Sequence, residues 1–195
     1  MPVLSAQTIQ KRGILWPCLS AGEDSRGCSY GLSACGYDLR VGEDVTITSP
    51  LMGVMFYIDA LLLLMTSLHF ESIRIVAIPT AIVAVILSFV GGYMLIKSFQ
   101  LTWAMEEFNM PDDVVAMVYD KSSLARNGIA VQNTVAEPGW RGYLTLEITN
   151  HGWKNIRLKR GDAVAQVIFT QLDEKTTIPY DGKYQDQEEG AQLAR

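Results

Sequence analysis

The sequence predicts a mainly β protein, either a sandwich or a barrel, that is interrupted by an inserted α-helical hairpin. Short runs rich in β-branched and aromatic residues recur about every 8–12 residues and are separated by turn signals, a spacing typical of sandwiches and barrels and not of βαβ units. Residues 51–97 form an apolar block unlike the rest of the chain. We therefore expect one β domain over 1–50 plus 98–195 and a separate helical insertion over 51–97.

The expected elements follow one another along the chain. A short helix is expected over residues 5–11, with Ser5 as its N-cap. Residues 173–195 are polar and form either a frayed tail or, through Tyr180 and Lys183, a segment that closes over a ligand. The expected strands cover residues 45–47, 114–119, 142–148, 156–158 and 163–172.

Charge and composition exclude several classes of function. The 195 residues carry a formal net charge of −5, which argues against a general nucleic-acid binder. The cysteines, Cys18, Cys28 and Cys35, are odd in number and lack CxxC spacing, which fits a reduced compartment and not a disulfide framework. The histidines are His69 and His151, and although His69 is followed by Glu71 in HxE spacing, the sequence has no PCxxC element, so a zinc-dependent deaminase is not expected. The polar start of the chain predicts no secretory signal.

The apolar block predicts two helices, residues 51–70 and 75–96, joined by a polar link over 71–74. The second run carries no charge over 22 residues. At about 1.5 Å per residue it would span a hydrocarbon core of about 30 Å. The first run contains Asp59, whose charge would cost several kcal/mol at mid-membrane unless it is paired.

Three interpretations of the block remain open. The first is a transmembrane hairpin, which returns the chain to the side that it left and so leaves the β domain undivided. Small residues at Ala84, Ser88 and Gly92 would allow another helix to pack closely. The second is a pair of buried helices in a soluble oligomer, since Asp59 and Pro79 suit a protein interior. The third is a non-native or chimeric segment.

Residues 121–126 gather groups that bind phosphate. Lys121, Ser122 and Ser123 lie just before Arg126, and a triphosphate needs several donors and cations at such fixed spacing. The alternative interpretation is a solvated turn.

Glu147 is a lone carboxylate in the apolar run 143–148. Between Leu146 and Ile148 we expect a dry setting in which the pKa of a carboxylate rises toward neutrality, as acid–base chemistry requires. Beside phosphate-binding groups, this residue indicates chemistry on a nucleotide. The alternative is a glutamate at the edge of a strand.

These motifs resemble the dCTP deaminase branch of the dUTPase/dCTP deaminase superfamily. The similarity covers residues 1–50 and about 98–190. It rests on ordered motifs: Val3-Leu4-Ser5, Gly36-Tyr37-Asp38-Leu39-Arg40, Phe108-Asn109-Met110-Pro111, Lys121-Ser122-Ser123-Leu124-Ala125-Arg126, Glu137-Pro138-Gly139-Trp140-Arg141-Gly142, Leu146-Glu147, Gly161-Asp162 to Gln166, and Tyr180-Asp181-Gly182-Lys183-Tyr184-Gln185.

The resemblance implies a dUTPase-like distorted jelly-roll or β-barrel subunit of a homotrimer, with active sites at the subunit interfaces. It implies a cytoplasmic catalytic domain that acts on dCTP, with Mg²⁺ bound through the triphosphate and no catalytic zinc. Glu147 would be the general base that deprotonates the water attacking cytosine C4, with Ser122 and Arg126 positioning that water.

The resemblance also assigns the residues that bind substrate. Lys121 and Ser123 would hold phosphate oxygens, Glu137 would reach the deoxyribose 3′-hydroxyl and Trp140 would pack nearby. Gln166 would bind the triphosphate. Tyr180, Lys183 and Gln187 would belong to a closing lid.

Two further functions remain open. A dUTPase or a bifunctional deaminase–diphosphatase would give dUMP, and the loop between Gly128 and Glu137, shorter than in many deaminases, helps to decide the product. A non-catalytic, membrane-tethered nucleotide-binding protein is the other alternative. Retention of Ser122, Arg126 and Glu147 together argues against it, because a pure binder does not need groups that activate water.

Overall fold

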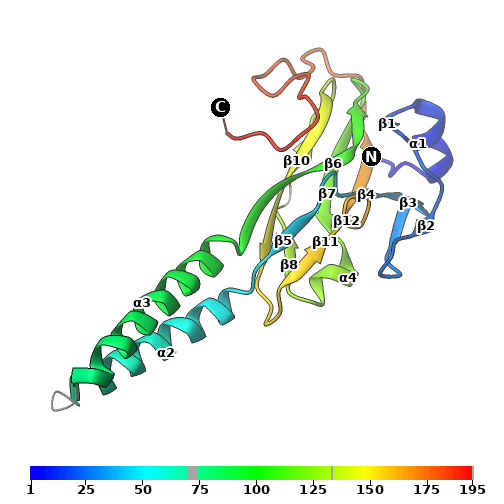
Figure 1. Cartoon of the computed structure of the whole chain (residues 1–195). Helices are drawn as coiled ribbons and strands as arrows, with labels where there is room; N and C mark the ends of the chain where they lie inside the picture. The colour runs from blue at the N-terminus through cyan, green and yellow to red at the C-terminus, as the bar shows by residue number, and fades with distance from the viewer. Residues whose placement is uncertain (70–73, 133, 195) are drawn as a thin grey trace. The chain divides into compact units, whose positions relative to one another are not determined.

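The structure, a computed structural model, describes residues 1–69, 74–132 and 134–194, so most of the predicted 71–74 link lies outside the described residues. The chain divides into two compact units (Figure 1). One, which we call the β unit, contains Met1–Val45, Leu101–Ile148 and Arg157–Arg195, and the other contains Thr46–Gln100 and Thr149–Ile156.

The described residues are mainly β outside the apolar block, which confirms the predicted class. The strands are β1 (Leu15–Trp16), β2 (Gly22–Glu23), β3 (Ser29–Ser33), β4 (Gly36–Arg40), β5 (Val45–Ile47), β6 (Phe99–Asn109), β7 (Val114–Asp120), β8 (Ile129–Val131), β9 (Val135–Ala136), β10 (Arg141–Asn150), β11 (Ile156–Leu158) and β12 (Ala163–Gln171). The sheets have the strand orders β2-β3-β4-β12-β7-β9, β1-β6-β10-β8 and β11-β5. The first of these sheets is antiparallel throughout.

The predicted helix at the N-terminus is α1, Ala6–Arg12, and Ser5 is its N-cap. The carbonyl of Ser5 accepts hydrogen bonds from the N–H groups of Thr8 and Ile9. Its hydroxyl lies 3.2 Å from the hydroxyl of Thr8 and caps no backbone group. Ile9 is fully buried, so this short helix is held mainly by its packing.

The sequence did not predict the long strand β6, because Glu106 and Glu107 interrupt its apolar pattern. Glu106 is fully buried. Its carboxylate accepts hydrogen bonds from the Nε of Arg40 at 2.8 Å and from the hydroxyl of Tyr37 at 3.2 Å. Burial raises the pKa of Glu106 and outweighs the opposing effect of Arg40. Burial, with Glu106 nearby, also raises the pKa of Tyr37. A buried ion pair thus lies in the core of the β unit.

The apolar block forms the helices α2, Pro50–His69, and α3, Arg74–Ile96, which pack against each other. Small residues line their contact: Gly53, Ala60, Ala84 and Gly91 are buried. A Cβ at Gly91 would lie 2.8 Å from the carbonyl oxygen of Gly53, so the two backbones approach too closely for a larger residue. Of the small-residue face predicted on the second helix, Ala84 is buried in this contact, and a Cβ at Gly92 would lie 2.8 Å from the hydroxyl of Tyr57.

The outer surface of the helices is apolar. Pro79–Ile96 has a mean hydropathy of 2.0 and is the one helix among the described residues long and apolar enough to cross a membrane. α2 contains a shorter apolar stretch, Pro50–Thr66. The exposed large side chains include Val54, Met55, Ile58, Leu61, Leu62, Met65, Ile82, Val85, Ile86, Phe89 and Tyr93.

Candidate active site

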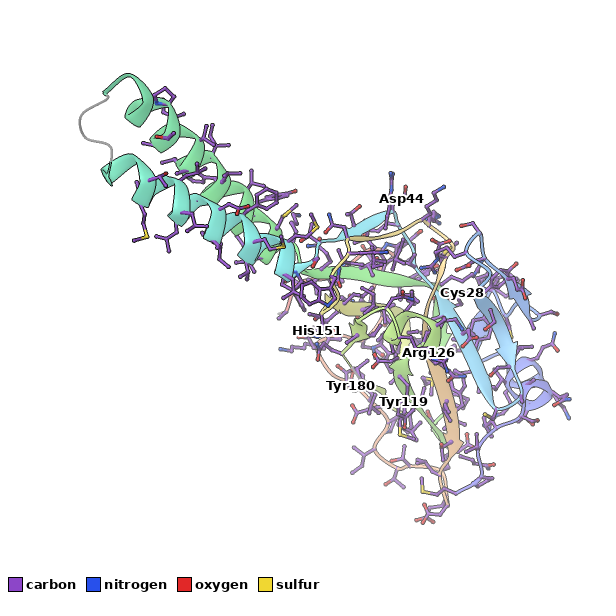
Figure 2. All side chains as sticks on the ribbon, turned by 90° about the horizontal axis from the view of Figure 1, so that it is seen from below. Cys28, Asp44, Tyr119, Arg126, His151 and Tyr180 are labelled. Carbon is purple, nitrogen blue, oxygen red and sulfur yellow. The ribbon has the colours of Figure 1, made fainter. Side chains whose placement is uncertain are left out.

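The helical turn α4, Ser122–Ala125, carries the predicted water-positioning residues Ser122 and Arg126. It links β7 to β8, and the N–H of Arg126 donates to the carbonyl of Ser122 over 3.2 Å. Residues four positions apart in a helical turn share a face. Both side chains are exposed, and the guanidinium of Arg126 (labelled in Figure 2) has no carboxylate partner among the described residues. The turn therefore presents a hydroxyl and an unneutralised cation together.

Ser123, in the same turn, has a buried hydroxyl oxygen that lacks a hydrogen-bond partner within the described part of the chain. A buried hydroxyl without a partner is costly, and most such groups in folded proteins are satisfied. A ligand oxygen or a water molecule would satisfy it here. This agrees with the predicted contact between Ser123 and a phosphate oxygen.

Lys121 lies at the N-terminus of α4, but its ammonium group is engaged inside the β unit. Its Nζ donates to Oδ2 of Asp38 at 2.7 Å and to the hydroxyl of Ser29 at 2.9 Å. The side chain is only 8% exposed, and that of Asp38 7%. Two of the three N–H donors of the ammonium group are thus occupied before any phosphate binds. The spacing of Lys121, Ser122 and Ser123 in the sequence could not indicate this.

Gln166 lies in the same region of the sheet. Its position on β12 is in register with Asp38 on β4 and with Tyr119 on β7. Residues directly opposite each other on neighbouring strands share one face of a sheet. Gln166 is half-buried and Tyr119 is 40% exposed. The structure thus groups Gln166 with Lys121 and with the start of α4, as a shared phosphate site requires.

Glu147 lies on β10, where exposure alternates along the strand. Leu146 and Ile148 are buried on one face, whereas Glu147 is half-buried on the other. The expectation that its two neighbours surround its carboxylate is therefore wrong, because adjacent strand residues point to opposite faces. The carboxylate instead shares its face with Tyr143 and Thr145, and it is accessible within the single chain.

The C-terminal segment that the sequence left open, as either a frayed tail or a lid, is placed against the start of β10. The N–H of Tyr180 donates to the carbonyl of Pro138 at 2.8 Å. Gln187 is buried, and its Nε2 donates to the hydroxyl of Thr145 at 2.5 Å. Its carbonyl accepts the N–H of Tyr143 at 2.9 Å. Lys183 is exposed, with its ammonium 4.9 Å from the ring of Tyr184.

Gln187 and Glu147 are brought to the same face of β10. Gln187 binds Thr145, which is two residues before Glu147 and points the same way. Two residues along a strand span about 7 Å. The tail therefore reaches the neighbourhood of the predicted general base. The hydrogen bond to Thr145 shows this position, which the sequence motif did not indicate.

Glu137 and Trp140 lie elsewhere. Glu137 is exposed just before β10, and Trp140 is 5% exposed. The indole of Trp140 packs against Phe108, with ring centroids 5.7 Å apart, and donates to the carbonyl of Tyr184 at 2.8 Å. The six-residue step along the strand from residue 141 to Glu147 spans about 20 Å. One chain therefore does not gather all the predicted residues around a single point.

The described residues contain no group of three or more His, Cys, Asp and Glu side chains that could hold a metal ion. The polar groups on α4 and at Lys121 and Gln166 are instead hydroxyls, an amide and cations. Such groups suit the oxygens of a phosphate chain.

Comparison with known proteins identifies the family of the chain. The family model "dCTP deaminase-like" matches residues 27–172. The dCTP deaminase of Campylobacter concisus is 34% identical over 165 residues, which cover 82% of this chain and 78% of the relative. That of Campylobacter jejuni is 33% identical over 182 residues, which cover 91% of this chain and 87% of the relative.

Among solved structures, the dCTP deaminase of Agrobacterium tumefaciens gives a TM-score of 0.49 at 15% identity and covers 87% of this chain and 47% of that chain. The dUTPase of EIAV gives a TM-score of 0.45 at 18% identity and covers 84% and 92%. With both scores below 0.5, the family assignment rests on the sequence matches alone. By those matches, the chain belongs to the dCTP deaminase-like family.

Proposed function

We propose that this chain is a dCTP deaminase, which converts dCTP and water to dUTP and ammonia. The observation that supports it most directly is the accessible carboxylate of Glu147, in a family member that also presents Ser122 and Arg126 on α4. Deamination at C4 needs a base for the attacking water and a donor for the leaving group. A carboxylate can serve as both in turn.

In the proposed reaction, Glu147 takes a proton from water while the water oxygen bonds to C4 of cytosine. The resulting tetrahedral centre then loses its amino group, which leaves as ammonia after receiving a proton from the Glu147 carboxyl. Ser122 and Arg126 hold the water and stabilise the negative charge that develops as it attacks. The bond formed is C4–O and the bond broken is C4–N, without change of oxidation state.

The triphosphate is proposed to bind at α4 and the neighbouring row of the sheet. Ser123 would donate its unsatisfied hydroxyl, Gln166 its amide, and Lys121 the one ammonium donor that Asp38 and Ser29 leave. Mg²⁺ would be held by the phosphate oxygens, since the described residues offer no carboxylate cluster for it. The ion would add positive charge beside Lys121, whose own positive charge is already paired with a carboxylate.

The site is proposed to be completed in a homotrimer. Glu137 and Trp140 precede β10, whose first residue, Arg141, lies about 20 Å along the strand from Glu147, so a sugar contact by Glu137 would come from a different copy. The tail residues Tyr180, Lys183 and Gln187 would close over the bound nucleotide. Gln187 already hydrogen-bonds to Tyr143 and Thr145 on β10, and Tyr180 to Pro138 just before the strand, so only a short movement of the segment would be needed.

The test is to incubate the protein with dCTP or dUTP, with and without Mg²⁺, and to identify the products. We expect ammonia and dUTP from dCTP, with the rate lost on chelation of Mg²⁺. Pyrophosphate and dUMP together with ammonia would show the bifunctional alternative, and pyrophosphate from dUTP alone would show a dUTPase. Binding without any product would show the non-catalytic alternative.

We propose further that α2 and α3 anchor a cytoplasmic catalytic domain to a membrane. Their outward side chains are apolar, and the 23 residues of α3 span about 34 Å at the helical rise. Asp59 is exposed near the middle of α2, and packing of hairpins within an oligomer would enclose it. Sedimentation of the full chain with membranes, and its release only by detergent, would support this proposal.

Deletion of residues 52–97 is expected to leave a soluble and active enzyme. The N–H of Thr48 donates to the carbonyl of Lys97 at 3.1 Å, so the two ends of the insertion already meet and a short turn can join them. Size-exclusion chromatography and dCTP turnover test this. Aggregation, or loss of turnover in a folded product, would contradict it and show that the helices support the β fold.

A further inference from the structure

A loop distant in sequence is fixed at the base of the two apolar helices. The N–H of Asn150, at the end of β10, donates to the carbonyl of Ser98, and its side chain donates to the carbonyl of Ile47 at 3.0 Å. Ser49 makes two further hydrogen bonds to this loop. Its hydroxyl donates to the carbonyl of Gly152 at 2.6 Å, and its N–H donates to Oδ1 of Asn155 at 2.8 Å. Figure 2 labels His151 in this loop.

This attachment is polar and is centred on two fully buried residues. Asn150 and Ser49 are both 0% exposed, and Asn150 also holds the loop itself, through the N–H of Gly152 at 2.8 Å and the carbonyl of Lys154. Buried side-chain hydrogen bonds of this kind specify one arrangement, because leaving any of them unmade costs the full desolvation of its groups. The loop over residues 149–156 is therefore held in a defined place next to residues 47–49 and 98.

The loop presents an aromatic ring and a cation at that place. Trp153 is 72% exposed although its backbone is fixed, and Lys154 is exposed beside it. At the end of α3, Tyr93 is 59% exposed and the ammonium of Lys97 lies 5.9 Å from its ring centroid. We call Tyr93, Lys97, Trp153 and Lys154 the basal collar.

We infer that the basal collar binds the headgroup region of a lipid bilayer. This inference rests on the proposal that α2 and α3 enter the membrane. It adds a position for the bilayer surface, which would lie at the basal collar. Indole and phenol rings concentrate at the membrane–water interface because they are apolar with one polar edge, and lysines there bind anionic headgroups. Away from the collar the exposed helix surface is mostly apolar, with Asp59 as an exposed charge. This change from aromatic and basic side chains to apolar ones is the change found at that interface. A second copy of the chain would need no such change.

The inference is tested on the full chain in vesicles of phosphatidylcholine and phosphatidylglycerol, with bromine atoms placed either near the headgroup or near the centre of the bilayer. We expect shallow bromines to quench tryptophan fluorescence strongly. Trp153→Phe should lose this quenching. Trp16→Phe should retain it, because Trp16 is equally exposed, at 74%, but belongs to the other unit. Both substitutions replace an exposed indole by a smaller aromatic ring, so neither is expected to unfold the chain.

A second variant tests the cations. Lys97→Glu combined with Lys154→Glu should shift the emission of Trp153 to the red on anionic vesicles, because repulsion lifts the loop into water. Lys11→Glu, exposed on α1, should leave the emission unchanged.

The outcomes separate the two proposals. If the chain floats with vesicles but Trp153→Phe is quenched like the wild type, the collar is wrong and the hairpin still inserts. If the full chain stays soluble as an oligomer, both are wrong and the helices pack against other copies. Turnover of dCTP, measured on the same samples, reports the enzymatic proposal separately.

Discussion

Glu147→Gln is expected to abolish release of ammonia from dCTP while nucleotide binding is largely retained. The amide has nearly the shape of the carboxylate but cannot accept the proton of the attacking water. Loss of a general base lowers turnover by about 10²- to 10⁴-fold. The triphosphate groups lie on α4 and around Gln166, so affinity should change little. Ammonia release and dCTP binding to the variant, measured by calorimetry, check the two expectations separately.

The matched control is Glu107→Gln, a surface carboxylate on β6 that has no assigned role. It should leave turnover and binding unchanged. Near-normal ammonia release by Glu147→Gln would remove this residue from the mechanism. A variant that lost binding and turnover together would instead make Glu147 a substrate-binding residue.

Glu106→Ala is expected to lower the free energy of unfolding of the β unit by about 3–5 kcal/mol, the range for breaking a buried ion pair. The substitution leaves the guanidinium of Arg40 and the hydroxyl of Tyr37 without the acceptor that they share. The backbone N–H of Arg40, 3.0 Å from the other carboxylate oxygen, loses its partner as well. Urea unfolding of the chain lacking residues 52–97 measures this effect without the apolar helices.

Glu107→Ala provides the control, because this neighbouring glutamate is exposed. It should leave stability nearly unchanged. Combining Glu106→Leu with Arg40→Leu should recover part of the lost stability, since apolar side chains can replace a buried pair. Equal and small effects of Glu106→Ala and Glu107→Ala would show that the Arg40 pair contributes little.

The fold class could be predicted, and candidate site residues could be proposed, because their signals are local. The short runs that became β7, β10 and β12 carry turn residues at their ends, and Ser122 and Arg126 are separated by one helical turn. The helical insertion was recognisable from its lack of charge alone. Such patterns involve residues close in sequence, where spacing determines which side chains meet.

The remaining features depend on contacts between distant residues. Lys121 and Asp38 are 83 positions apart, and no short motif shows that one neutralises the other. The burial of Glu106 likewise depends on Arg40, 66 positions away. The face to which Glu147 points was a local property, fixed by strand alternation, and it is shared with Tyr143 and Thr145 and not with the chain neighbours Leu146 and Ile148. The position of the tail required the hydrogen bond between Gln187 and Thr145.

The pairing of Lys121 with Asp38 bears on how a charged substrate reaches this protein. A lysine neutralised at 2.7 Å projects little field into the solvent, and the chain as a whole carries a formal charge of −5. A nucleoside triphosphate is itself a polyanion, so at long range it meets repulsion. Attraction begins only within about 8 Å, the screening length at physiological salt, near cations such as Arg126. Added salt should therefore hasten the encounter, opposite to its effect on enzymes that attract their substrate from afar.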